Sequence, residues 1–283
     1  MSRKSATQFI AFWLLRLVCY TVVAATGYII LDIAAKGWPH LSWEFLTAMP
    51  RNRMSAGGIW PAIVGTLYLV LLTIALAFPL GVGAAIYLGE YARAGRLTRT
   101  IRLAIANLAG VPSVVFGLFG LGVFVIFFNF GTSLLASAFT LAMMILPVII
   151  TASEEALRAV PQGFREGSFA LGATKWPTVR RSVLPYALPG MLTGSILSVS
   201  RVAGETAPVL LTGAALSAAM PESVFDQIMI LPYHLFILAT NMYPSQVYVP
   251  LAYSTALVLL LVVLGLNGVA IAIRYVVRRK HSF

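Results

Sequence analysis

The chain has 283 residues, of which 59% are apolar and 10% are charged, and its mean hydropathy is +0.89. A water-soluble domain of this length could not hide so much apolar surface, so the composition indicates a membrane protein. The net charge of +11 comes from basic residues dispersed between apolar runs, which argues against nucleic-acid binding, and the single cysteine excludes a disulfide framework.

Six apolar segments are each long enough to cross a membrane, since a spanning helix needs about 20 residues. They predict one all-α, polytopic transmembrane domain over residues 1–283, with a core at about 55–275 and with the first span and an external loop at 1–54. The predicted spans are Leu17–Ala35, Ile63–Gly89, Leu108–Phe128, Ser133–Ala152, Leu188–Thr212 and Leu251–Ile273. The first has no convincing cleavage site and exceeds a signal-peptide core in length, so we expect it to be retained.

The distribution of Lys and Arg between the loops predicts the orientation. The side that holds the termini and the loops after the second and fourth spans is rich in basic residues, among them Arg3, Lys4, Arg16, Arg93, Arg96, Arg99, Arg102, Arg158, Arg165, Lys175, Arg180, Arg181, Arg274, Arg278, Arg279 and Lys280. The opposite side has Lys36, Arg51 and Arg53. Under the positive-inside rule, both termini and the loop at 154–185 are therefore cytoplasmic.

The beginning of the third span contains Pro112 followed by Ser113. A helix that starts here could leave backbone N–H groups aimed into a transport path, an arrangement that favours anions. The commoner explanation of the pattern is a plain helix-start signal. The sequence leaves both interpretations of Ser113 open.

The predicted cytoplasmic loop at 154–185 carries a short amphipathic stretch. Pro161 should end the helix that leaves the fourth span. After it, Phe164, Leu171 and Trp176 mix with charged residues, and the stretch ends near Gly172. A surface helix with this pattern is typical of a segment that docks onto another protein.

The same loop contains a spaced motif in which Glu166-Gly-Ser is followed by Gly172 and then by Leu184-Pro185. The motif resembles the EAA loop of bacterial ABC-importer permeases, with Gly167 and Ser168 where alanines are typical. The resemblance implies that the loop is a coupling helix, which docks in a groove of a cytoplasmic ATPase. The residues that the resemblance assigns to coupling are Arg165, Glu166, Gly167, Ser168, Gly172, Ala173, Leu184 and Pro185.

Arg201 and Glu205 are the two charged residues deepest in any predicted span. A centrally placed Arg costs at least about 2.5 kcal/mol on insertion scales, so it should face the bundle interior or a wet cavity. The spacing of the two residues predicts that they share one helix face. They could form a self-neutralising pair that fixes helix packing, or Arg201 could attract an oxyanion while Glu205 keeps the binding from becoming too tight.

Four segments resemble the phosphate-specific subfamily of these permeases, the PstA family: Ala56–Thr66, Leu108–Gly117, Glu154–Pro161 and Arg201–Pro208. The likeness runs from about residue 55 to the end of the chain. It implies a type I, MetI-like permease in the bacterial inner membrane, which imports inorganic phosphate by alternating access. It also implies a substrate path that includes Arg201, Glu205, Thr206 and Ser113.

The resemblance further implies a set of partners. These are a second permease chain that is PstC-like, a dimeric ATPase that is PstB-like and holds ATP-Mg, and a periplasmic phosphate-binding protein that is PstS-like. The expected arrangement has the two permeases enclosing the path, the ATPases below them and the binding protein above.

The segment Val224–Asn241 is apolar enough to suggest a seventh span. It contains Asp226, Pro232 and His234, and counting it as a span would move the basic C-terminal tail to the outside. We therefore expect an external helix that is interfacial or re-entrant.

The chain has no P-loop, no metal-ligand cluster and no catalytic triad, so the sequence predicts no catalytic residue, no metal and no cofactor bound by this chain. A channel or secondary transporter would also explain six spans and an intramembrane Arg–Glu pair, but neither needs a coupling helix. A membrane-embedded enzyme would need clustered nucleophiles or metal ligands at one depth. A sister importer for sulfate, molybdate or phosphonate would share the coupling loop, and the sequence leaves that alternative open.

Overall fold

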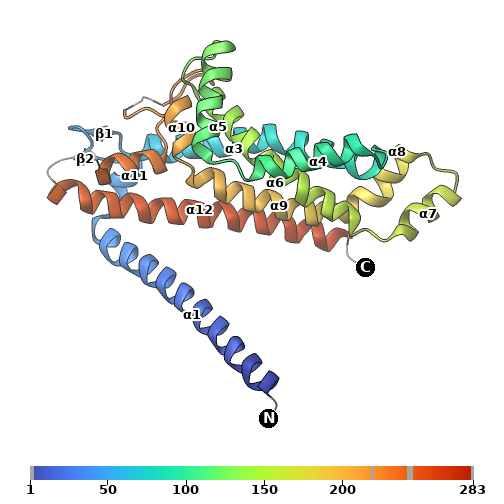
Figure 1. The fold of residues 1–283 in the computed structure, drawn as a ribbon. Helices are drawn as coiled ribbons and strands as arrows, with labels where there is room; N and C mark the ends of the chain where they lie inside the picture. The colour runs from blue at the N-terminus through green and yellow to red at the C-terminus, as the bar shows by residue number, and fades with distance from the viewer. Residues whose placement is uncertain (1–2, 218–219, 241–244, 282–283) are drawn as a thin grey trace.

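The computed structural model describes residues 3–217, 220–240 and 245–281, and its regular structure is almost entirely helical (Figure 1). The first half contains α1 (Arg3–Gly37), η1 (Trp38–His40), α2 (Trp43–Thr47), the paired strands β1 (Pro50–Arg51) and β2 (Ala56–Gly57), α3 (Trp60–Ile86), η2 (Tyr87–Tyr91), α4 (Arg96–Ala109), α5 (Ser113–Gly120) and η3 (Leu121–Phe127). The second half contains α6 (Leu134–Arg158), α7 (Gln162–Ala170), α8 (Lys175–Thr178), η4 (Val179–Val183), α9 (Leu184–Gly204), α10 (Ala207–Thr212), α11 (Leu231–Thr240) and α12 (Ser245–His281). The predicted all-α class is confirmed.

Five helical segments of the described chain are long and apolar enough to cross a membrane. They are Ala11–His40, Trp60–Tyr91, Leu134–Arg158, Lys175–Gly204 and Gln246–Arg279. These segments confirm the existence of the first, second, fourth, fifth and sixth predicted spans. A sixth span exists if α4 and the segment formed by α5 and η3 are counted together.

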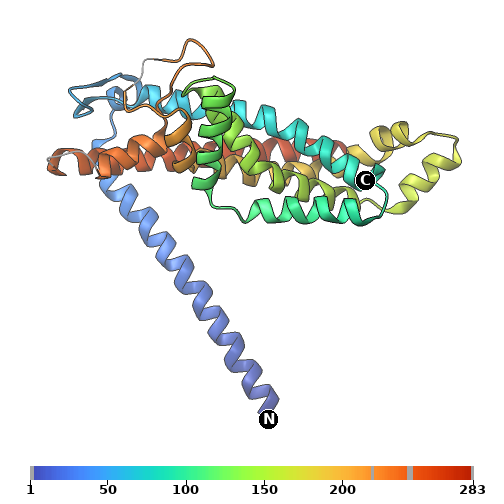
Figure 2. The ribbon, with the colours of Figure 1, turned by 45° about the horizontal axis from the view of Figure 1, so that its top comes forward.

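The third predicted span, Leu108–Phe128, is not one straight helix. α4 ends at Ala109, and the segment that starts at Ser113 departs from it at 103°. Pro112 accounts for the break, because it has no N–H to donate and keeps the preceding residue out of the helical conformation. The predicted helix start is confirmed, since α5 begins directly after Pro112. Figures 1 and 2 show α5 standing across the bundle, whereas α4 runs along it.

The fifth predicted span, Leu188–Thr212, is also interrupted. α9 ends at Gly204, Glu205 is extended with φ −75° and ψ 130°, and α10 follows from Ala207. Pro208 explains the break, because in a continuous helix its ring would collide with the carbonyl of Gly204, four residues earlier. The prediction of an unbroken helix is therefore wrong at the C-terminal end of this span.

The bundle is formed by α3, α6, α9 and α12, whose long axes run together in both views (Figures 1 and 2). Small residues allow the helices to approach closely. Gly81 of α3 faces Ile149 of α6, and Gly194 of α9 faces Ala152 of α6, so that a Cβ at either glycine would collide with its neighbour. Close packing of this kind is how helices associate in a lipid environment, which provides little hydrophobic driving force between them.

The two ends of the bundle differ. One end carries α7, α8 and the last turns of α12, and the other carries the β1–β2 hairpin and α11 (Figure 1). Glu90 of η2 and Arg165 of α7 are bonded to each other, so the loops that follow the second and fourth spans lie at the same end. This is the grouping that the Lys and Arg pattern predicts, while the side of the membrane to which that end belongs stays a prediction.

The predicted external segment Val224–Asn241 contains the short helix α11, whose 10 residues are too few to span a membrane. The chain is fully buried where it approaches this helix, at Ile228 and Leu231. The backbone N–H of Leu231 donates to Oγ1 of Thr66 in α3 at 2.9 Å. Because the segment enters the bundle, the re-entrant alternative fits better than an interfacial helix. Asn241 lies outside the described residues.

Candidate functional site

The α7 loop, defined as residues 159–178, projects from one end of the bundle (Figures 1 and 2). No residue of α7 is buried, and Leu171 directly after it is 91% exposed. Gly172 has a φ of +80°, a left-handed conformation that glycine adopts without strain, and this reverses the chain towards α8. The loop therefore presents an accessible and partly apolar tip.

The residues that the sequence assigned to coupling divide into two groups. Glu166, Gly167 and Gly172 are exposed, whereas Arg165, Ser168, Ala173, Leu184 and Pro185 are half-buried. The Ser168 and Thr178 hydroxyl groups share a hydrogen bond of 2.9 Å, and the ring of Phe164 packs on that of Tyr186 with centroids 4.4 Å apart. The Phe164–Tyr186 contact thus holds the loop against α9, the Ser168–Thr178 bond closes the loop on itself, and the exposed residues form its outer surface.

Arg165 makes the strongest attachment of α7. Its Nη2 lies 2.7 Å from Oε1 of Glu90, and its Nε lies 3.2 Å from the same oxygen. Its Nη1 donates to the carbonyl of Val160 at 2.8 Å, and Nη2 also donates to the carbonyl of Leu157 at 2.9 Å. The Arg165 and Glu90 side chains are 14% and 10% exposed. Buried charges need both pairing and hydrogen bonds, and this pair has both.

Sequence reasoning overlooked Glu90. It lies in η2, a wide π-helical turn that continues α3 beyond Ile86, and such turns are often found at functional sites. A signal was available, because Glu90 is an acidic residue between an apolar span and a loop rich in arginine. The identity of its partner depends on how the helices pack, which the sequence does not encode locally.

A second charged group at the same end does not involve α7. Oε1 of Glu154 lies 2.6 Å from Nη2 of Arg102 and 2.7 Å from Nη2 of Arg158. Arg102 also donates to the carbonyl of Leu88 in η2 at 2.9 Å. This group joins α4 to α6 and to the end of α3, and it leaves the α7 loop untouched.

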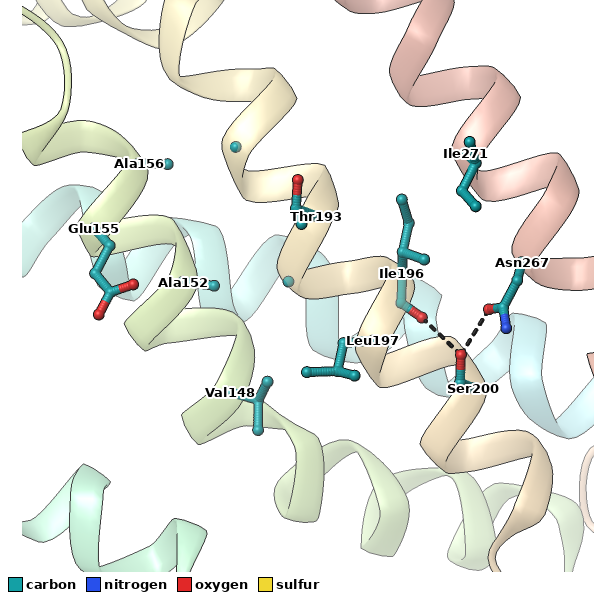
Figure 3. A pocket seen from close by; sticks show the side chains of 12 residues that line it. Val148, Ala152, Glu155, Ala156, Thr193, Ile196, Leu197, Ser200, Asn267 and Ile271 are labelled. Atoms are coloured by element: carbon teal, nitrogen blue, oxygen red, sulfur yellow. Dashed lines mark hydrogen bonds between the residues drawn. The ribbon is translucent and has the colours of Figure 1, made fainter. Parts of the chain in front are cut away.

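A groove with a volume of about 670 Å³ lies between α6, α9 and α12, and we call it the α9 groove. Figure 3 shows its lining, which is largely apolar but includes Glu155, Thr193, Ser200 and Asn267. Oγ of Ser200 and Oδ1 of Asn267 are 2.6 Å apart, and Nη1 of Arg274 donates to Oγ1 of Thr193 at 3.1 Å. Polar side chains are thus spaced along the accessible side of α9.

Arg201 directly follows Ser200, in the last turn of α9. Its Nε lies 3.4 Å from Oε1 of Glu205, and the two side chains are 38% and 18% exposed. The two residues do not share one continuous helix as predicted, because α9 ends before Glu205, but the carboxylate still turns back towards the guanidinium. Among the described residues, Glu205 is the partner of the Arg201 side chain.

Ser113 and Thr206 occupy comparable positions at helix starts. Ser113 is the first residue of α5, and Thr206 immediately precedes α10. The two short helices pack on each other, since a Cβ on Gly117 of α5 would come 2.9 Å from the Cα of Pro208 in α10. The structure therefore brings these two helices together, but no hydrogen bond or ion pair is recorded between Ser113 and Arg201, Glu205 or Thr206 in the described chain. The role of Ser113 in the path stays a prediction.

The chain also matches a known family. Residues 77–281 fit the family described as the inner membrane component of binding-protein-dependent transport systems. The chain belongs to this permease family. Together with the long apolar helices, this makes it a multi-pass inner-membrane protein.

Individual relatives narrow the group within the permease family. The phosphate transport system permease protein PstA 1 of Mycobacterium tuberculosis is 38% identical over 92% of this chain and 82% of its own length. PstA of Mycobacterium leprae is 35% identical over 95% of this chain and 84% of its own length. The chain thus belongs with the PstA permeases, as its motifs indicated.

Solved structures confirm the type I, MetI-like fold. A chain of a bacterial ABC transporter involved in the import of the acidic polysaccharide alginate superposes with a TM-score of 0.64 at 13% identity, covering 99% of this chain and 98% of that chain. A chain of the MetNI methionine ABC transporter superposes with a TM-score of 0.59 at 20% identity, covering 78% and 94%.

Proposed function

We propose that this chain is the permease subunit of an ATP-driven importer of inorganic phosphate, in which it forms half of the translocation path and transmits the motion of a cytoplasmic ATPase. The permease role rests on the family and the fold. The substrate rests on the PstA relatives, whose names specify phosphate transport, and on the chemistry of Arg201.

Arg201 is the observation that carries the substrate proposal. Within the described part of the chain, the Arg201 side chain contacts Glu205 through Nε at 3.4 Å, and both terminal Nη groups retain hydrogen-bonding capacity. A guanidinium presents its N–H groups as a planar fork that matches two oxygens of a phosphate. Glu205 reduces the net positive charge, so phosphate binds weakly enough to move on. Thr206 follows Glu205 in the chain and adds a hydroxyl group beyond the end of α9.

The α7 loop supports the coupling part of the proposal. The apolar residues Phe169, Leu171 and Trp176 are exposed on this loop, which also carries the exposed Glu166. A cytoplasmic ATPase with a complementary groove would cover these side chains. Nucleotide chemistry stays on that partner, which holds ATP-Mg, and this chain supplies no catalytic residue.

The partners and the orientation follow from the same proposal. We infer a second permease that is PstC-like, a dimeric ATPase that is PstB-like and an external phosphate-binding protein that is PstS-like. Both termini and the α7 loop face the cytoplasm, in keeping with the concentration of Lys and Arg at that end. ATP binding closes the ATPases, moves α7, and opens the path towards the binding protein.

Transport by the reconstituted complex tests the proposal. The complex is placed in vesicles with its ATPase and binding protein, and uptake of labelled phosphate is measured with and without ATP. We expect uptake that requires ATP and persists in excess sulfate or molybdate. Uptake without ATP would contradict an importer driven by an ATPase, and displacement of phosphate by sulfate would assign the path to a different oxyanion.

A further inference from the structure

Glu90 and Arg165 join two helices that are distant in sequence. Glu90 lies in the last turn of the long helical segment formed by α3 and η2, and Arg165 lies 75 residues later in the middle of α7. The chain itself connects α7 to α6 on one side and to α8 on the other. Besides these covalent connections and the contact of Phe164 with Tyr186 in α9, the ion pair attaches α7 to the helical segment formed by α3 and η2.

The geometry of Arg165 makes this attachment stiff. Its guanidinium contacts the Glu90 carboxylate through Nε and Nη2, and it contacts the carbonyls of Val160 and Leu157 through Nη1 and Nη2. A planar group bonded in three directions has little freedom to rotate. Removal of one charge from a nearly buried pair leaves the other unpaired, which is strongly unfavourable. α7 consequently cannot shift without displacing Glu90 or breaking the pair.

We propose that Glu90 is a positioning residue for energy coupling: through Arg165 it makes α3 move with α7 when the ATPase displaces the α7 loop. α3 packs along α6 through Gly81 and Ile149, so a displacement of α3 reaches the helices that border the α9 groove. This inference rests on the proposed function, because it assumes that α7 receives the motion of an ATPase. It adds the residue that conveys that motion to the bundle.

The chain offers a matched control in Glu154. This carboxylate is similarly buried, at 11% exposure, and it pairs with Arg102 and Arg158 at the same end. Neither partner belongs to α7. Loss of the Glu154 charge should weaken the packing of α4 on α6 without separating α7 from α3. Loss of the Glu90 charge should separate α7 from α3.

The first test compares Glu90→Gln with Glu154→Gln in the reconstituted complex. The quantity measured is the number of phosphate ions imported per ATP hydrolysed. We expect Glu90→Gln to lower this ratio at least tenfold while ATP hydrolysis continues, and Glu154→Gln to retain the ratio at a reduced yield of complex. An unchanged ratio in Glu90→Gln, or an equal loss in Glu154→Gln, would overturn the inference.

The second test restores the link covalently. In a Cys19→Ser background, Glu90→Cys and Arg165→Cys are combined and joined with a short thiol-specific cross-linker. The double variant should be uncoupled before cross-linking and should regain coupling afterwards. If cross-linking brings no recovery, the pair does not act as a tether.

A third readout needs no substrate and separates this inference from the proposed function. Spin labels at the exposed positions Tyr87 and Gln162 report the distance between η2 and α7. We expect one narrow distance distribution with and without ATP in the parent complex, and a broad one in Glu90→Gln. Equal distributions in both would overturn the tether. A parent complex that hydrolyses ATP without importing phosphate would instead contradict the proposed function and leave this readout unaffected.

Discussion

The two Arg–Glu pairs at the ends of α9 and α3 differ in how completely they are satisfied. Arg165 and Glu90 are nearly buried and joined by short contacts, and two backbone carbonyls accept further hydrogen bonds from the same guanidinium. Arg201 and Glu205 make one contact of 3.4 Å, and the Arg201 side chain is 38% exposed. The Arg165 guanidinium is bonded within the protein through Nε, Nη1 and Nη2. The Arg201 guanidinium is bonded through Nε and retains hydrogen-bonding capacity for a ligand.

This contrast teaches that an ion pair in a membrane protein is not by itself a sign of function. A fully satisfied pair resists change and suits a mechanical link. A loosely held and partly exposed pair contributes little to stability but can exchange partners at low cost. On this contrast we propose that the α7 end transmits force and that the Arg201 end contacts the substrate.

The largest effect is expected from Arg201→Gln. A charge-assisted hydrogen bond to an oxyanion is worth about 1.5–3 kcal/mol, so phosphate uptake should fall by about 10–100-fold. Arg201→Lys keeps the charge but loses the planar fork, so its phosphate uptake should lie between that of the parent complex and that of Arg201→Gln. The measurement is initial uptake in vesicles, with ATP hydrolysis and complex yield as controls. Normal uptake in Arg201→Gln would contradict the proposal that the Arg201–Glu205 pair, unlike the Arg165–Glu90 pair, contacts the substrate.

A somewhat smaller effect is expected from Glu166→Lys. The residue is exposed on α7 and makes no recorded ion pair within the described chain, so its replacement should leave insertion and folding intact. Reversal of its charge on a docking surface should lower the affinity for the ATPase by about tenfold, because like-charge contacts at an interface are unfavourable. Co-purification of the ATPase and uptake should decline together. Retention of both would show that the outer side of α7 is not the docking surface.

Gly172→Ala should have the smallest effect, and it sharpens the description of the loop tip. Gly163 and Gly172 both have open space around them, but of the two only Gly172 has positive φ, at +80°. An Ala in the left-handed region costs about 1–2 kcal/mol, whereas an Ala within α7 should be slightly favourable. Uptake should therefore fall several-fold in Gly172→Ala and stay level in Gly163→Ala. Equal uptake in the two variants would show that the turn shape does not matter for docking.

Much of the fold could be predicted from the sequence because lipid imposes a simple length and hydropathy rule on spanning helices. The two errors in the spans have visible local causes in Pro112 and Pro208. Proline within a span can be tolerated as a kink, and only the surrounding packing decides between a kink and a break. The short helix α11 was predicted in kind, as a helix that does not span the membrane, because Asp226, Pro232 and His234 interrupt its apolar run.

The candidate site was less predictable. The spacing around Glu166 and Gly172 predicts a coupling loop, since that motif is local, and the coupling role stays a prediction. Glu90 could not be paired with Arg165 in advance, because the pairing depends on the packing of α3 beside α6 and on the wide turn at η2. For the same reason, the sequence did not show that α9 ends between Arg201 and Glu205. The two residues therefore do not share one continuous helix as expected, although their side chains are still paired.

The most direct test of the account is phosphate uptake by the double variant Arg201→Gln with Glu205→Gln. If the pair only fixed helix packing, simultaneous removal of both charges would leave no unpaired group, and uptake would recover relative to either single variant. We predict that the double variant inserts, assembles and hydrolyses ATP with its partners but imports phosphate at least tenfold more slowly than the parent complex. Near-normal uptake by an equally well assembled double variant would contradict the assignment of Arg201 to the transport path.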